Sequence, residues 1–214
     1  MNVRTGGLMM QSLVTTLLGG IAIFVSIIQA AEPVDSLFPA LARCQAARAA
    51  YPTGSHYADH FQALAQETTD GFAEFCLSFM PNDPHQAIGW LEQAAQKGLP
   101  EAQLLLATAY ELGHRVEVDP RQAWYWYQAA AHKNFGPAQY EVAAILYGGT
   151  RLGQSQDFAK ALFWAELAAY NRVPQATELR DILLKLVAPD EAAAIRHAVR
   201  SWLNQHHLSS RRSS

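Results

Sequence analysis

Apolar and small residues recur in the middle of the chain with the spacing of amphipathic helices. Ala102, Leu106 and Tyr110 follow one another at intervals of four, so they lie on one face of a helix. The next such face, between residues 120 and 134, consists of Ala123, Trp126, Tyr127, Ala130 and Ala131. We therefore expect two short helices between residues 102 and 134, joined by a loop from Gly113 to Asp119.

The same pattern recurs at a period of 36 to 38 residues. The corresponding positions of three successive copies are Ala87, Trp90, Ala94, Ala95; Ala123, Trp126, Ala130, Ala131; and Ala161, Trp164, Ala168, Ala169. Such a period is typical of proteins in which each helical pair buries its apolar face only against its neighbours. The sequence thus predicts an all-α fold, an α-solenoid of helix-turn-helix repeats with helical caps at both ends.

Particular residues are expected to begin, end and separate these helices. Asp83, Asp119 and Asp157 are predicted N-caps, the first two with proline at the following position. Gly98 and Asn134 are expected to adopt the left-handed conformation that closes a helix. Beside the paired alanines, Trp126 and Trp164 are expected to fill the wedge between adjacent hairpins.

These residues resemble the Sel-one-like repeat (SLR) family, a branch of the tetratricopeptide-like helical repeats. The clearest copy carries the pattern at Ala102, Gln103, Leu106, Tyr110, Gly113, Val116, Asp119, Ala123, Trp126, Tyr127, Ala130 and Ala131. The resemblance covers about residues 70–187. It implies a binding scaffold without catalytic activity, in which the first helix of each pair lines a concave surface.

The chain is expected to divide into five parts. They are a signal peptide, 1–30; N-terminal capping helices, 34–69; repeats, 70–187, with a degenerate copy at 70–101 and clear copies at 102–137 and 138–175; a C-terminal capping helix, 188–206; and a flexible tail, 207–214.

The N-terminal segment predicts export. No charged residue occurs from Thr5 to Ala31, and the apolar stretch from Leu13 to Ile28 has the length of a signal-peptide core. We expect cleavage after Ala30. The alternative is an uncleaved anchor in the inner membrane formed by residues 5–31. Either arrangement places the repeats in the periplasm.

Charge and cysteine content narrow the partners and the compartment. The formal net charge of −3 offers no basic field for nucleic acid or for an acidic membrane surface, so a membrane is a partner only if the N-terminal segment remains as an anchor. Cys44 and Cys76 form an even pair in an exported chain, which favours a disulfide. Two buried free thiols are the alternative.

Candidate chemistry is sparse. His56 and His60 stand four residues apart with Asp59 between them, but no third ligand follows at a recognisable spacing. We therefore expect ordinary exposed histidines, no metal and no cofactor. Neither a Gly-x-Ser-x-Gly nor a Ser-x-x-Lys motif occurs, and no phosphate-binding loop is found, so no catalytic residue is predicted.

Two surfaces are candidate binding sites for a protein or peptide. The predicted concave residues are Leu104, Thr108, Glu111, Tyr140, Ala144 and Tyr147, continued by Glu178, Ile182 and Lys185. The alternative is that the capping helices fold over these residues and use them as core. Tyr125 and Phe163 form a second, convex candidate, although aromatic residues in such runs more often belong to the core.

Three functions compete at this point. The leading hypothesis is a non-enzymatic exported scaffold that binds a protein or peptide partner. The resemblance also allows an immunity or inhibitor protein that neutralises a secreted toxic enzyme. A hydrolase acting on cell-wall material or on a β-lactam is the third, and it lacks a recognisable catalytic motif.

Overall fold

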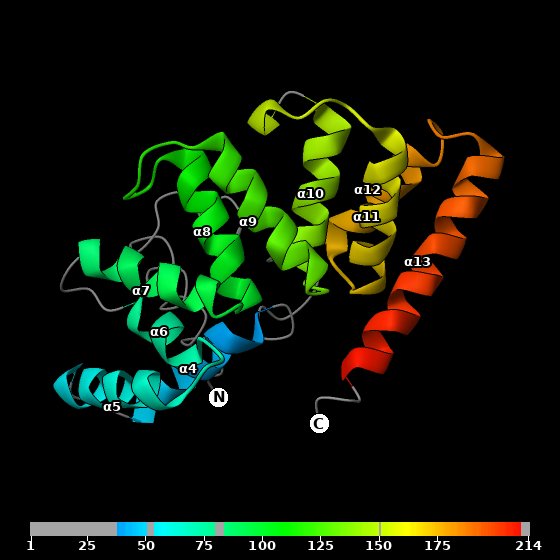
Figure 1. Ribbon diagram of the computed structural model, residues 1–214. Helices are drawn as coiled ribbons and strands as arrows, with labels where there is room; N and C mark the ends of the chain where they lie inside the picture. The colour runs from blue at the N-terminus through cyan, green and yellow to red at the C-terminus, as the bar shows by residue number, and fades with distance from the viewer. Residues whose placement is uncertain (1–37, 51–53, 80–83, 150, 211–214) are drawn as a thin grey trace, which may run out of the picture. The chain divides into compact units, whose positions relative to one another are not determined.

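The computed structural model describes residues 38–50, 54–79, 84–149 and 151–210, and over these ranges all regular structure is helical (Figure 1). The helices are α4 Pro39–Ala50, α5 Gly54–Glu67, α6 Phe72–Leu77, α7 Pro84–Gln96, α8 Pro100–Leu112, α9 Pro120–His132, α10 Gly136–Gly148, the 3₁₀ turn η1 Arg151–Gly153, α11 Phe158–Tyr170, α12 Pro174–Leu183 and α13 Pro189–Ser210. The predicted all-α class and the helix-turn-helix repeats are confirmed. The predicted signal peptide and anchor, residues 1–31, and the N-cap Asp83 lie outside the described residues.

Each repeat consists of a first helix, here helix A, and a second helix, helix B. The A helices are α6, α8, α10 and α12, and the B helices that follow the first three are α7, α9 and α11. The chain divides within α9 into two compact units, residues 1–123 and residues 124–214, and each is described by itself.

In the first unit, the described helices pack in succession. α5 contacts α6, α6 contacts α7, and α7 contacts α8, while α4 lies against α6 (Figure 1). The largest fully buried side chains of this unit include Phe61, Phe75, Leu77, Leu104 and Leu106. Small residues at the helix contacts, such as Ala94 and Ala95, are also buried, which allows the helix backbones to approach closely.

In the second unit, α11 is the central helix. It contacts α10, α12 and α13, and α13 lies along it (Figure 1). On α13, Val199 and Leu203 are buried, whereas Ile195 and Trp202 are half-buried. The helix continues to Ser210, so residues 207–210 of the predicted flexible tail are helical, and residues 211–214 lie outside the described ranges.

The predicted helix ends are confirmed where the structure describes them. Asp119 Oδ1 accepts the backbone N–H groups of Arg121 at 2.9 Å and Gln122 at 3.1 Å. Asp157 Oδ1 accepts the N–H of Lys160 at 2.9 Å. These carboxylates satisfy N–H groups that have no partner within the helix itself.

The left-handed positions at the ends of the B helices also follow the repeat. Gly98 has a φ of 90° and Asn134 a φ of 61°, as predicted, and Arg172 takes the equivalent position with a φ of 61°. A residue with a Cβ is strained in this conformation, so the tertiary structure holds Asn134 and Arg172 there.

Two glutamines near the start of the A helices are buried and fix the same turn. Gln103 Nε2 donates to the carbonyl oxygen of Ala95 at 3.0 Å, and Gln139 Nε2 donates to that of Ala131 at 3.3 Å. Each bond satisfies a carbonyl at the C-terminal end of the preceding B helix. The glutamine therefore links consecutive hairpins, a role that the sequence pattern did not reveal.

The two consensus tryptophans differ in burial. Trp164 is 7% exposed, in agreement with its predicted place in a wedge, but Trp126 is only half-buried. Its neighbour Tyr127 is fully buried instead. Burial of the predicted wedge residue is therefore nearly complete for Trp164 and partial for Trp126, because α9 turns Tyr127 toward the core.

The structure contains the predicted disulfide between Cys44 and Cys76, whose Cα atoms lie 5.3 Å apart. It joins α4 to α6, and both cysteines are buried. The alternative of two free thiols is excluded.

Candidate functional site

On α8, the predicted binding residue Leu104 belongs to the core. Its side chain is 2% exposed, and Thr108 and Glu111 are half-buried. One turn before Leu104, the buried carboxylate of Glu101 accepts the backbone N–H of Ala40 in α4 at 3.1 Å. The expectation that Leu104 is exposed is wrong, because its side chain belongs to the core of the first unit.

On α10, the equivalent residues Tyr140, Ala144 and Tyr147 are partly exposed. They are continued by exposed residues on α12, which contacts α10, and in the turn that follows α12. We call the following set the second-unit A face: Tyr140, Ala144, Tyr147, Glu178, Ile182 and Lys185. Ile182 is 43% exposed, which is high for a large aliphatic side chain. The face thus combines accessible apolar groups with one acidic and one basic residue.

Burial and nearby carboxylates favour the protonated form of the Tyr140 hydroxyl. Burial raises the pKa of Tyr140, and the nearby carboxylates of Glu141 and Glu178 raise it further, while Arg151 acts in the opposite direction. A neutral phenol both donates and accepts hydrogen bonds. Tyr140 can therefore offer a polar group and an aromatic surface to the same partner at neutral pH.

An ion pair between a buried carboxylate and a partly exposed arginine supports this side of α10. Arg151 Nη1 lies 2.7 Å from Glu141 Oε2, and the Arg151 guanidinium carbon lies 5.8 Å from the centre of the Tyr127 ring. Glu141 is buried, so its charge requires such a partner. The pair holds the loop after α10 close to the second-unit A face.

The second predicted surface contains one clearly exposed aromatic residue. Tyr125 is 58% exposed, with its ring centre 4.9 Å from that of Trp126. Phe163 is half-buried, and its ring meets Trp164 edge-on at 5.3 Å. Tyr125 is thus accessible to a partner, whereas Phe163 also packs within its own unit.

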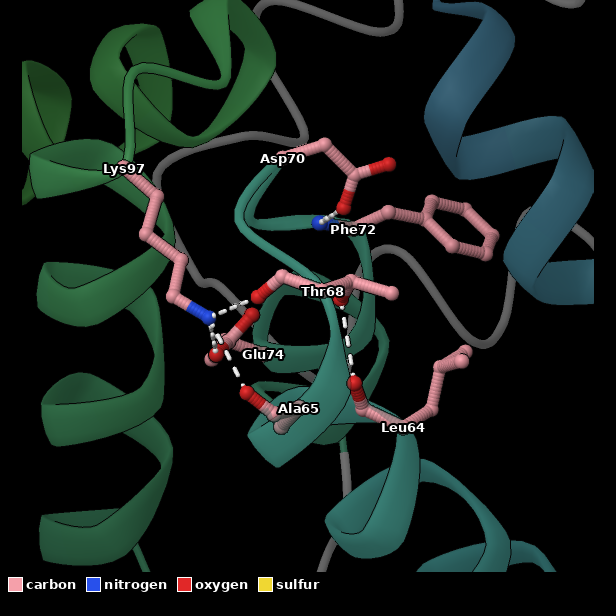
Figure 2. A network of polar contacts seen from close by, with 7 residues as sticks. All are labelled: Leu64, Ala65, Thr68, Asp70, Phe72, Glu74 and Lys97. Carbon is pink, nitrogen blue, oxygen red and sulfur yellow. Dashed lines mark hydrogen bonds and ion pairs between the residues drawn. The ribbon is translucent and has the colours of Figure 1, made fainter.

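A second buried charge in the first unit belongs to the architecture. The Lys97 ammonium group lies 2.5 Å from Glu74 Oε1, and it donates hydrogen bonds to the carbonyl oxygens of Ala65 at 3.0 Å and Thr68 at 2.6 Å. The three groups surround the end of the Lys97 side chain in Figure 2. Glu74 is buried, and Lys97 is anchored at the end of α7. The contacts tie the turn between α5 and α6 to the next repeat.

The exposure predicted for the histidine pair is confirmed. His56 and His60 are both exposed on α5. Among the residues that the structure describes, no three histidine, cysteine, aspartate or glutamate side chains gather closely enough to hold a metal ion.

No helix within the described ranges combines the length and the apolar character needed to cross a bilayer.

Comparison with known protein families identifies three consecutive repeats in the chain. The Sel1 repeat matches residues 76–99, 100–135 and 136–172. A Sel1 repeat protein from Oxalobacter formigenes, known from a crystal structure, is 30% identical, with a TM-score of 0.53; the match covers 57% of this chain and 95% of that protein. Among curated proteins no match was found.

A second solved structure resembles the chain in fold. It is a protective antigen present in uropathogenic Escherichia coli strains, with 24% identity and a TM-score of 0.60. The match covers 72% of this chain but 34% of the antigen, so the chain spans about a third of that protein.

Proposed function

The chain belongs to the Sel1 repeat family, and from this membership we propose that it is a non-enzymatic, exported scaffold that binds a protein or peptide partner. Sel1 repeats are helical scaffolds that typically mediate protein interactions. Stacked helical pairs suit this role because they present an extended surface without a deep cavity.

We assign partner binding to the second-unit A face. The observation that carries this proposal is the partial exposure of Tyr140 and Tyr147 beside the exposed Ile182. Aromatic and aliphatic groups at the centre of a contact, with charged residues around them, are typical of protein interfaces. On α8 the equivalent Leu104 is already buried, so the second unit offers the more accessible part of the predicted surface.

A double substitution tests this assignment. The Tyr140→Ser/Tyr147→Ser variant should bind the partner captured by the wild-type protein from periplasmic extract at least about tenfold more weakly, equivalent to ~1.4 kcal/mol. The matched control is Tyr125→Ser, which removes an exposed aromatic ring outside this face and should leave capture unchanged.

Two results would reject the assigned face. If the double variant folds and binds as the wild type does, the site lies elsewhere, and Tyr125 with Phe163 is tested next. If the double variant unfolds, Tyr140 and Tyr147 act mainly as core residues. The circular dichroism spectrum of each variant separates these two results.

Export is the second part of the proposal. The Cys44–Cys76 disulfide supports it, because disulfides persist in oxidising compartments outside the cytoplasm. The charge-free segment from Thr5 to Ala31 supports it independently. N-terminal sequencing of protein from the native host should find Ala31 as the first residue. Repeats recovered from the cytosol with Met1 intact would contradict export.

A further inference from the structure

A small pocket lies in the first unit where α7 and α8 meet. Its walls are largely apolar and include Phe79, Leu91 and Leu105, while His114 and Arg115 line it from the loop that follows α8. The pocket has a volume of about 20 Å³, which admits a group slightly larger than a water molecule. It therefore has room for the end of one side chain rather than for a large ligand.

Arg115 has a counterpart in the next repeat. Arg115 and Arg151 are each the second residue after the glycine that ends their A helix. In the second unit, Arg151 Nη1 lies 2.7 Å from Glu141 Oε2. Counted back from the same glycine, Glu141 corresponds to Leu105, which lines the pocket. The first repeat therefore has the arginine but a leucine in place of its carboxylate.

The charge of Arg115 is not balanced by the part of the first unit that the structure describes. Within these ranges, none of the ion pairs includes Arg115, and no acidic residue lines the pocket. His114 Nε2 is buried there without a hydrogen-bond partner. A guanidinium group has only donors, and their planar arrangement matches a carboxylate. The apolar pocket thus has a basic edge that lacks an acceptor of its own.

Exposed apolar residues at the same loop indicate contact with a protein. Leu112, at the end of α8, is 53% exposed, and Val118 is 61% exposed. A Cβ added at Gly113 would lie 2.7 Å from Val118 Cγ2, so Val118 also lies at the end of α8. Exposed apolar groups that gather in one place are typical of interaction sites. A segment with an acidic side chain between apolar neighbours matches both the loop and the pocket.

We propose that this pocket binds a glutamate side chain of the protein partner, with the carboxylate on Arg115 and the methylene groups against Leu91 and Leu105. This inference rests on the proposed function, because it takes the ligand to be part of a protein. The partner's glutamate has the same role toward Arg115 that Glu141 has toward Arg151 within the second unit.

A short peptide tests the pocket on the full chain. The probe is a blocked valine–glutamate–valine peptide, and its control carries glutamine in place of glutamate. Chemical shifts of the backbone amides should show saturable binding of the probe at residues 112–118, and the control should bind at least about tenfold more weakly. Arg115→Gln should cause a similar loss, whereas Arg121→Gln, which removes an exposed arginine nearby, should leave binding unchanged.

A second pair of variants tests the correspondence between the repeats. Leu105 is half-buried, and Leu105→Glu places a carboxylate where the second unit has Glu141. This carboxylate should pair with Arg115 and abolish binding of the peptide, while the circular dichroism spectrum remains that of the wild type. Leu105→Gln has the same length without the charge and should keep binding.

Three outcomes would overturn the inference. The pocket does not recognise a carboxylate if the wild type fails to bind the glutamate peptide, or if the glutamine peptide or Arg115→Gln binds equally well. Propionate, the free equivalent of the glutamate side chain, would assign the pocket to a small molecule if it bound as tightly as the peptide. None of these measurements uses the captured partner or depends on Tyr140 and Tyr147, so failure here is distinguishable from failure of the second-unit A face.

Discussion

Replacing Trp164 by alanine should destabilise the second unit more than the same change at Trp126. The two residues occupy the same position of consecutive repeats, and both lie in the second unit, so each serves as the control for the other. They differ in burial, since Trp164 is 7% exposed and Trp126 is half-buried.

The expected magnitude follows from the buried area. A tryptophan side chain offers about 200 Å², and nine-tenths of this at about 25 cal/mol per Å² corresponds to roughly 4 to 5 kcal/mol. The alanine retains part of this area, while the cavity adds a cost, so Trp164→Ala should lower the free energy of unfolding by about 3 to 5 kcal/mol. At Trp126, water and neighbouring side chains reach the vacated space, and the loss should be about 1 to 3 kcal/mol.

Urea unfolding followed by far-ultraviolet circular dichroism measures both losses without using tryptophan fluorescence. The slope of free energy against urea should remain that of the wild type, so that a shifted midpoint reports stability. Repeat proteins can unfold in stages, and the comparison is made within one compact unit because both tryptophans belong to it. A loss at Trp126 equal to or larger than that at Trp164 would refute the reasoning from burial.

Three further predictions concern the bridge, a buried phenol and a tight loop. Thiol titration of the denatured, unreduced protein should find no free cysteine, and two free thiols would contradict the bridge. Reducing the disulfide between Cys44 and Cys76 should lower the free energy of unfolding by about 3 to 4 kcal/mol. Burial raises the pKa of Tyr57 to about 12, against a smaller opposing effect of a nearby arginine. Between pH 10 and pH 12 the phenol of Tyr57 is therefore deprotonated in the unfolded state before it is deprotonated in the folded state. The free energy of unfolding should then fall by up to about 1.4 kcal/mol per pH unit. In unfolding curves measured over this pH range, Tyr57→Phe should remove this part of the decline. At Gly149, φ is 77° and an added Cβ would lie 2.6 Å from the Cβ of Gln156, whereas at Gly153 φ is 69° and the space is open. Gly149→Ala should therefore lower the free energy of unfolding by about 1 to 3 kcal/mol more than Gly153→Ala does. Equal losses of stability in thermal unfolding would argue against the close approach of Gln156 to Gly149.

The local elements of this fold are determined by short stretches of sequence. The spacing of Ala102, Leu106 and Tyr110 selects a helix, because only a period near 3.6 residues places them on one side. Asp119 satisfies N–H groups within its own helix, and Gly98 adopts its left-handed conformation without a steric cost. Both effects act over a few residues, so they were predictable without knowledge of distant contacts.

The accessible surface was decided by segments far apart in the chain. Leu104 and Tyr140 occupy equivalent positions, yet Leu104 is buried and Tyr140 is partly exposed, and α4, some 60 residues earlier in the chain, reaches α8 at Glu101. The period describes how a hairpin meets its neighbours and carries no information about a non-repeating helix that lies over them. The ion pair of Lys97 with Glu74 and the unequal burial of Trp126 and Trp164 likewise depend on tertiary packing. Sequence thus determined the helices and their register, and the tertiary structure determined which of their faces remain open to a partner.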